Sequence, residues 1–143
     1  MRILGIDHGD RRFGLALSDP GKSFAFPFEV IEGEDALFKR LGPLLEEKEV
    51  ERIIVGLPLN MDGSTGKKAN QVLDFKERLF EKFSITIDVW DERLTTVQAE
   101  NLLREVGGSA RKRKSRVDMV AAQIILQSYL DAHTPVPGEE GSG

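Results

Sequence analysis

The stretch Arg2–Ser18, RILGIDHGDRRFGLALS, contains the pattern that decides the fold of this chain. Its first part is a short apolar run that ends at Asp7, and residues 12–18 alternate between bulky and small side chains. Alternation with a period of two is typical of a β-strand whose two faces meet different surroundings. Residues 8–11 include a glycine that can turn the chain. We therefore predict a β-hairpin with one bulky face and one small face.

Strand and helix patterns alternate after this hairpin. Residues 24–31 form a third strand interrupted by Pro27, which favours the edge of a sheet. Residues 52–57 are a nearly continuous apolar run, as in a strand buried on both faces, and residues 85–90 form a fifth strand. The other segments carry apolar residues at helical spacing. The order is three strands, then helix, strand, helix, strand, helix, helix, which predicts a mixed sheet with helices on both faces.

The limits and faces of the first three helices can be read from single residues. Pro43 leaves open whether the first helix bends or ends early. Thr95 and Gln98 have the spacing of a capping box, so a third helix should begin there and end at the glycines 107–108. In the second helix, the residues expected to face the core are Ala69, Val72, Leu79, Phe80 and Phe83.

The last helix is expected to follow a basic loop at residues 111–116. Ser115 and Asp118 have capping-box spacing, which places the start of the helix beside them. The composition of residues 135–143 cannot form a core, so we expect a disordered tail there. Residues 1–134 are then expected to form a single domain.

Composition restricts the protein to a few classes. The chain has 143 residues, enough for one domain with a core, a net charge of −4 and no cysteine. The lack of cysteine excludes disulfides and thiolate metal sites. We find neither a signal peptide nor an apolar run of the roughly 18 residues that span a membrane, so we expect a cytoplasmic protein without a membrane partner. Residues 111–116 place five cations in six positions, which indicates either a solvated loop or a phosphate-binding patch.

Acidic residues follow the predicted strands at the edge where α/β sheets bind their ligands. Asp7 ends the first strand, Asp91 and Glu92 end the fifth, and Asp118 begins the last helix. Crowded carboxylates repel one another unless cations neutralise them, and Mg²⁺ accepts oxygen ligands while leaving positions open for phosphate and water. Each acid also has an ordinary alternative. Asp7 can be a turn residue, Asp118 a helix cap, and Asp91 and Glu92 surface partners of Arg93.

A glycine-rich loop, Gly56–Ser64, follows the apolar run. It offers backbone N–H groups and small side chains near the start of a helix, and such a loop can hold phosphate. Within it we assign Asn60 and Gly63 to substrate binding. The loop does not match the GxxxxGK[ST] pattern, so it does not indicate ATP binding.

Four motifs of the chain resemble those of the YqgF family, also called RuvX, of RNase H-like nucleases related to the resolvase RuvC. They are GIDHGDRRFGLALSD (5–19), IIVGLPLNMDGSTG (53–66), DERLTTVQAE (91–100) and VDMVAAQIILQSYLD (117–131). Together they cover about residues 1–131. One departure is Asp10, where relatives often carry Thr or Ser, and it adds a negative charge close to the expected site.

The resemblance implies an RNase H-like α/β fold, with a five-stranded mixed sheet in the order 3-2-1-4-5 and the second strand antiparallel to the rest. It also implies hydrolysis of phosphodiesters with Mg²⁺ or Mn²⁺, held as two ions by Asp7, an acid of the DER motif and Asp118. Strand alternation lets only one acid of that motif face the site, and we favour Glu92 over Asp91. The implied role is maturation of the 5′ end of the 16S rRNA precursor, and the alternative is a Holliday junction resolvase acting on branched DNA.

Our mechanistic hypothesis is hydrolysis that leaves 5′-phosphate and 3′-hydroxyl ends, with Asp7, Glu92 and Asp118 as the catalytic acids. The phosphate-holding residues are expected to be Arg93, Lys112, Arg113, Lys114 and Arg116. The expected partners are structured RNA, branched DNA or pre-ribosomal particles. A rival of another class is a non-catalytic nucleic-acid-binding or ribosome-assembly module. The sequence leaves open whether the protein is a monomer or a homodimer, and whether it cuts internally or from an end.

Overall fold

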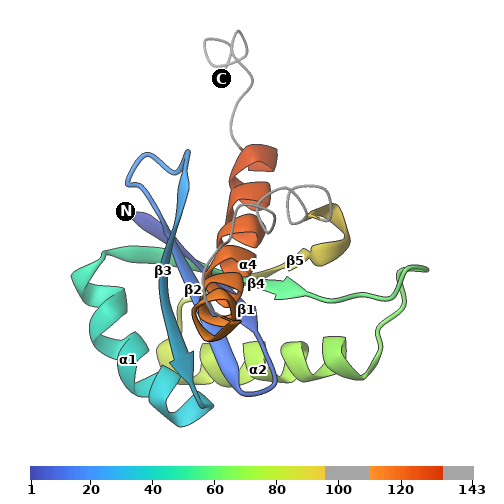
Figure 1. The fold of residues 1–143 in the computed structure, drawn as a ribbon. Helices are drawn as coiled ribbons and strands as arrows, with labels where there is room; N and C mark the ends of the chain where they lie inside the picture. The colour runs from blue at the N-terminus through green and yellow to red at the C-terminus, as the bar shows by residue number, and fades with distance from the viewer. Residues whose placement is uncertain (96–109, 134–143) are drawn as a thin grey trace, which may run out of the picture.

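The protein is a mixed β-sheet with helices on both faces (Figure 1). The computed structural model describes residues 1–95 and 110–133. Within the second range, side chains are described from residue 117 onward. The sheet order is β3-β2-β1-β4-β5. Strand β2 is antiparallel to β1 and β3, whereas β4 is parallel to β1 and β5. The expected RNase H-like fold is thereby confirmed. The strands are β1 (Arg2–His8), β2 (Arg12–Ser18), β3 (Ala25–Glu32), β4 (Val50–Leu57) and β5 (Thr86–Asp91), and the helices are α1 (Glu34–Glu47), α2 (Lys67–Phe83), the 3₁₀ helix η1 (Glu92–Thr95) and α4 (Ala110–His133).

The hairpin of β1 and β2 has the two faces predicted from its alternation. Leu15 and its neighbours two residues away are buried in a core cluster with α1 and α2, whereas Ala16 is buried in a second cluster with α4. The turn is closed by the N–H of Gly9, which donates to the carbonyl of Arg12 at 2.9 Å. Pro27 lies in the edge strand β3, where the register with β2 shifts, so its missing N–H leaves no ladder bond broken inside the sheet.

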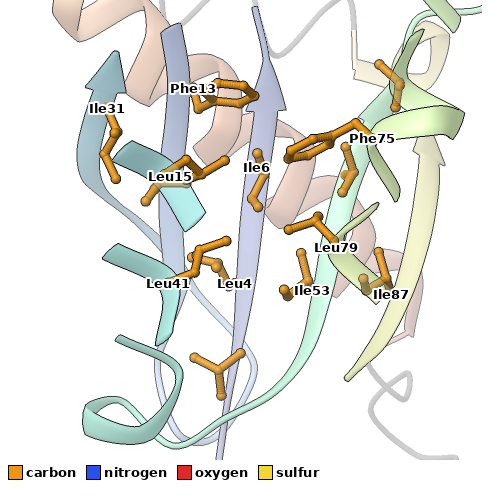
Figure 2. Close-up of a cluster of buried hydrophobic side chains, with 14 of the residues drawn as sticks. Leu4, Ile6, Phe13, Leu15, Ile31, Leu41, Ile53, Phe75, Leu79 and Ile87 are labelled. Carbon is orange, nitrogen blue, oxygen red and sulfur yellow. The ribbon is translucent and has the colours of Figure 1, made fainter. Parts of the chain in front are cut away.

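Helices α1 and α2 cover one face of the sheet. Figure 2 shows the cluster there, in which Phe75 lies among side chains from β1, β2 and β4. Phe75 is fully buried and stacks on Phe13 with ring centroids 5.3 Å apart. The expectation that Phe80 faces the core is wrong, because 53% of it is exposed. The buried stripe continues from Val72 through Phe75 to Leu79 at helical spacing, which turns Phe80 toward solvent. Helix α1 does not end early at Pro43, since it continues to Glu47.

Helix α4 covers the opposite face and lies very close to it (Figure 1). The strands offer glycines where the helix passes. A Cβ atom added at Gly14 would lie 2.0 Å from the carbonyl oxygen of Asp118, and one at Gly5 would lie 2.8 Å from the Cβ of Leu126. A Cβ at Gly56 would lie 2.5 Å from a terminal carbon of Ile125. Glycines on three neighbouring strands therefore set the height of α4 above the sheet.

We expect Gly14→Ala to destabilise the fold by about 3 kcal/mol, because the added methyl must displace the backbone of α4 rather than a flexible side chain. Gly66→Ala is the matched control, since its methyl would meet only the amide end of Asn60, at 3.3 Å. Urea unfolding of both variants measures the difference. Equal free energies of unfolding would contradict the close approach of α4 at Gly14.

Two expectations for the C-terminal part need correction. The last helix begins at Ala110, so residues 111–116 belong to a helix rather than to a loop. Asp118 consequently lies within α4, and the capping box that we predicted from Ser115 to Asp118 is wrong. The helix predicted to begin at Thr95 and the tail at 135–143 fall on residues outside the described part, apart from Thr95 itself, which ends η1. Among the described residues, no helix contains an apolar segment of the length that a membrane span requires.

Candidate active site

Asp7 lies near the end of β1, on the face of the sheet that α4 covers. Ile6 before it is fully buried against the other face, so the alternation of the strand turns Asp7 toward α4. Across the strand pair, Asp7 lies opposite Gly14, where the absence of a side chain lets the α4 backbone at Asp118 approach the sheet. The Asp7 side chain is partly buried.

Glu92 reaches Asp7 from the other side of β4. It is the first residue of η1, directly after β5, and an added Cβ at Gly56 would lie 2.9 Å from its carboxyl oxygen. Gly56 on β4 therefore leaves room for the Glu92 side chain to lie over the sheet toward β1. A hydrogen bond between the two carboxyl groups lowers the pKa of Asp7 and raises the pKa of Glu92.

Burial raises the pKa of both acids of this pair. The pKa of Asp7 is raised to about 6, first by burial and then by the like charge of Asp118. The pKa of Glu92 is raised to about 7, first by burial and then by the like charge of Asp7. The charge of Lys68 lowers the pKa of both acids without cancelling these effects. Near pH 7 the two carboxyl groups together therefore carry less negative charge than two free acids would.

Asp91 faces a different partner. Its two carboxyl oxygens accept hydrogen bonds from the guanidinium of Arg93 at 2.7–3.1 Å, and one of them also accepts the Arg93 backbone N–H at 2.9 Å. These hydrogen bonds lower the pKa of Asp91. Of the two neighbouring acids, the one beside Asp7 is therefore Glu92, whereas Asp91 is already neutralised by Arg93.

Asp118 approaches the pair from α4. Its carboxyl oxygen lies 3.9 Å from the guanidinium of Arg12, the first residue of β2, and its charge acts on Asp7. An open hollow of about 380 Å³ lies beside it, lined by Asp10, Arg11, Arg12, Glu32 and Asp118. Solvent and a phosphate group can thus approach Asp118 from this side.

The carboxylates present have the chemistry that a hard divalent cation requires, but they do not form a complete coordination sphere. Carboxylate oxygens without competing sulfur ligands suit Mg²⁺ or Mn²⁺, and the raised pKa values of Asp7 and Glu92 mark negative charge that a cation would stabilise. Within the part of the chain that the structure describes, no three His, Cys, Asp or Glu side chains are already clustered around one point. Asp7 and Glu92 form a pair, and Asp118 is turned toward Arg12 at its side.

The loop between β4 and α2 is held in a fixed shape. The N–H of Gly63 donates to the carbonyl of Asn60 at 2.8 Å, and the Asn60 amide donates to the Ser64 hydroxyl at 3.0 Å. Gly63 has a positive φ of 86°, which favours glycine at this position. Arg93 donates to the carbonyl of Met61 at 3.3 Å, so the loop is tied to η1 beside the acid pair.

The structure places the expected phosphate-binding residues unevenly. Arg93 lies beside the site in its ion pair with Asp91. The side chains of Lys112, Arg113, Lys114 and Arg116 lie outside the described part, although their backbone forms the first turns of α4. Sequence reasoning missed Lys68 and Arg12. The only signal for Lys68 was its place at the end of the glycine-rich loop, and Arg12 was visible only as part of the opening motif.

The sheet order, the helices on both faces and the acids at the end of β1 define an RNase H-like α/β protein. The chain belongs to the RuvX family, because the family model described as "RuvX: Holliday junction resolvase" matches residues 1–132.

Relatives agree with this assignment along nearly the whole chain. A protein of Desulforamulus reducens is 47% identical over 92% of this chain and 98% of its own length, and one of Halothermothrix orenii is 45% identical over 96% and 100%. Both carry the name "Putative pre-16S rRNA nuclease". Among solved structures, Thermus thermophilus RuvC in complex with a Holliday junction substrate has a TM-score of 0.59, with 14% identity over 94% of this chain and 97% of that chain. The fowlpox virus resolvase with Holliday junction DNA has a TM-score of 0.56, with 10% identity over 94% and 100%. At such low identity these two structures support the fold alone.

Proposed function

We propose that this protein is a divalent-metal-dependent nuclease that hydrolyses phosphodiesters at the acid pair of Asp7 and Glu92. The observation that carries the proposal is that two partly buried carboxyl groups lie against each other at the end of the central strand, with a third acid, Asp118, close enough for its charge to act on Asp7. Burying like charges costs free energy, and a bound cation would recover that cost. A module that only bound phosphate would gain nothing from concentrating negative charge there.

Each residue has a distinct task in this proposal. Asp7 and Glu92 would hold Mg²⁺ or Mn²⁺, and Asp118 would complete the set of ligands. Bound there, divalent ions supply Lewis-acid stabilisation of the phosphodiester and lower the pKa of water. Arg93 keeps Asp91 neutralised and holds the loop at Met61, so the loop can guide the substrate strand through Asn60 and Gly63. The basic residues at the start of α4 would bind flanking phosphates.

The substrate class that we favour is the precursor of 16S rRNA, cut near its 5′ end in the cytoplasm, free or within a pre-ribosomal particle. The near-full-length relatives named as pre-16S rRNA nucleases support this choice. Branched DNA is the second candidate, which the description of the family model supports. The two substrates differ in sugar and shape but present the same phosphates to the acids.

Wild-type protein is therefore expected to cleave precursor 16S RNA when Mg²⁺ or Mn²⁺ is present, and to cleave a four-way DNA junction more slowly. Glu92→Gln should lower kcat about a hundredfold, because it removes one charged ligand beside Asp7. Asp91→Asn should lower kcat less than tenfold, because that acid is bonded to Arg93. Quantitative gel assays with both substrates and a chelator control measure these rates.

The outcomes separate the candidate functions. Faster cleavage of the junction would transfer the assignment to branched DNA. Salt-dependent RNA binding without cleavage at any ion concentration would replace the nuclease by the non-catalytic module. A larger loss for Asp91→Asn than for Glu92→Gln would show that the other acid serves the site.

A further inference from the structure

Lys68 is a cation close to the acid pair of Asp7 and Glu92, and the proposed function has so far given it no role. It is the second residue of α2, which follows the loop after β4. Its charge lowers the pKa of Asp7 and of Glu92, so it lies within electrostatic reach of both acids. Its neighbour Lys67 makes no ion pair within the described residues.

The partner of Lys68 is an exposed acid outside the pair. The ammonium nitrogen of Lys68 lies 3.2 Å from a carboxyl oxygen of Asp10, with half of the Lys68 side chain and 80% of the Asp10 side chain exposed. Ion pairs this exposed are weakly stabilising and exchange readily. A lysine side chain is also long and flexible, with three donors that can be redirected.

The other cations near the site are engaged more firmly or elsewhere. Arg93 makes several short hydrogen bonds to Asp91, and Arg12 lies beside Asp118. Lys68 thus combines proximity to both partly buried acids with a partner that it can leave at little cost. A substrate phosphate held at Asp7 and Glu92 brings negative charge to the same place.

We propose that Lys68 leaves Asp10 and binds a non-bridging oxygen of the phosphate that is cut, which makes it a catalytic residue. This inference rests on the proposed nuclease function. It follows that Lys68 has two opposite effects on the site. Its charge repels a divalent ion in the free protein, and it stabilises the negative charge that grows on the phosphate during hydrolysis.

A purely structural lysine would not separate these two effects. Lys68→Gln is expected to lower kcat about a hundredfold and at the same time to tighten Mn²⁺ binding to the free protein about threefold, measured by isothermal titration calorimetry without substrate. Lys68→Arg keeps the charge and should restore kcat to within about tenfold of wild type. Lys67→Gln is the matched control in the same helical turn, and its kcat and Mn²⁺ affinity should stay within twofold of wild type.

Asp10→Asn tests the exchange itself. If the ion pair only braces the hairpin against α2, removing either partner must have the same effect, and Asp10→Asn must lose as much activity as Lys68→Gln. In our proposal Asp10→Asn releases Lys68 toward the substrate, so activity is kept or increased. Equal losses in these two variants would overturn the proposal, as would weaker Mn²⁺ binding by Lys68→Gln.

The experiment also separates this inference from the proposed function. Wild-type protein that cleaves neither substrate would overturn the nuclease function and the role of Lys68 with it. Wild-type protein that cleaves, with Lys68→Gln matching Lys67→Gln, would overturn the role of Lys68 alone.

Discussion

Asp7→Asn is expected to reduce ion-dependent cleavage by about a thousandfold or more, which corresponds to about 4 kcal/mol of transition-state stabilisation. Asparagine keeps the size and position of the side chain at the end of β1 but removes the charge that a divalent ion needs. The pKa of Asp7 is affected by Glu92, Asp118 and Lys68 together, which places Asp7 at the centre of the site. No other acid of the described site can therefore replace it.

The same substitution should make the metal-free protein more stable at pH 7.5. The pKa of Asp7 is raised to about 6 from 3.8, and each pKa unit corresponds to about 1.4 kcal/mol. Removing the ionisable group therefore stabilises the folded state by about 3 kcal/mol in a chelator-containing buffer. In wild type, added Mn²⁺ should raise the midpoint of thermal unfolding, and in Asp7→Asn it should not.

Asp74→Asn is the control, because Asp74 is an exposed acid of α2. It should change neither activity nor stability appreciably. An Asp7→Asn protein that is inactive and also less stable would mean that the substitution damages the fold, and the proposed role of Asp7 would lose its support. Full activity of Asp7→Asn would refute that role outright.

The hairpin was predictable because its information is local. Alternation along residues 12–18 fixes which side chains enter the core, and the turn needs only Gly9 and its neighbours. The structure uses the small face of that strand for the close approach of α4, since Gly14 leaves space for the helix backbone. The order of the strands was not local information. It came from the resemblance to a family, because hydrophobic patterns do not say which strand is central.

Other features depended on tertiary structure and escaped sequence reasoning. Residues 111–116 read as a loop because a run of cations has no apolar period, yet lysine and arginine are good helix formers and α4 includes them. Phe80 was predicted to face the core, but the buried stripe of α2 runs through Phe75 and Leu79 and leaves Phe80 exposed. Lys68 carries no motif. It meets the acids only because the first turn of α2 lies beside the hairpin turn that holds Asp10.

The buried acid pair should also give the metal-free protein an unusual dependence of stability on pH. In the folded state Glu92 has a pKa of about 7, raised from 4.5, and that of Asp7 is about 6, raised from 3.8. Between the unfolded and folded values, the folded state keeps protons that the unfolded state has released. Raising the pH through this window therefore favours unfolding, and the loss is complete above about pH 7.

One neighbouring group acts in the opposite direction. Burial lowers the pKa of His8 below its usual 6.5, so the folded state loses stability as the pH falls through the unfolded value. The acids with lowered pKa values, such as Asp91 and Asp62, act only below about pH 4. A comparison between pH 5 and pH 8 is therefore sensitive to the acid pair and to His8, and a variant that retains His8 cancels its contribution.

Glu92→Gln is that variant. From pH 5 to pH 8 in the presence of a chelator, the free energy of unfolding of wild type should fall by about 2 kcal/mol more than that of Glu92→Gln. Urea unfolding at several pH values measures both curves. In the proposed function a divalent ion binds the ionised acids, so adding Mn²⁺ at pH 8 should return the lost stability to wild type and not to the variant. Parallel curves without Mn²⁺ would show that Glu92 ionises as an ordinary surface acid. The proposal that a divalent cation neutralises this pair of like-charged acids would then be refuted.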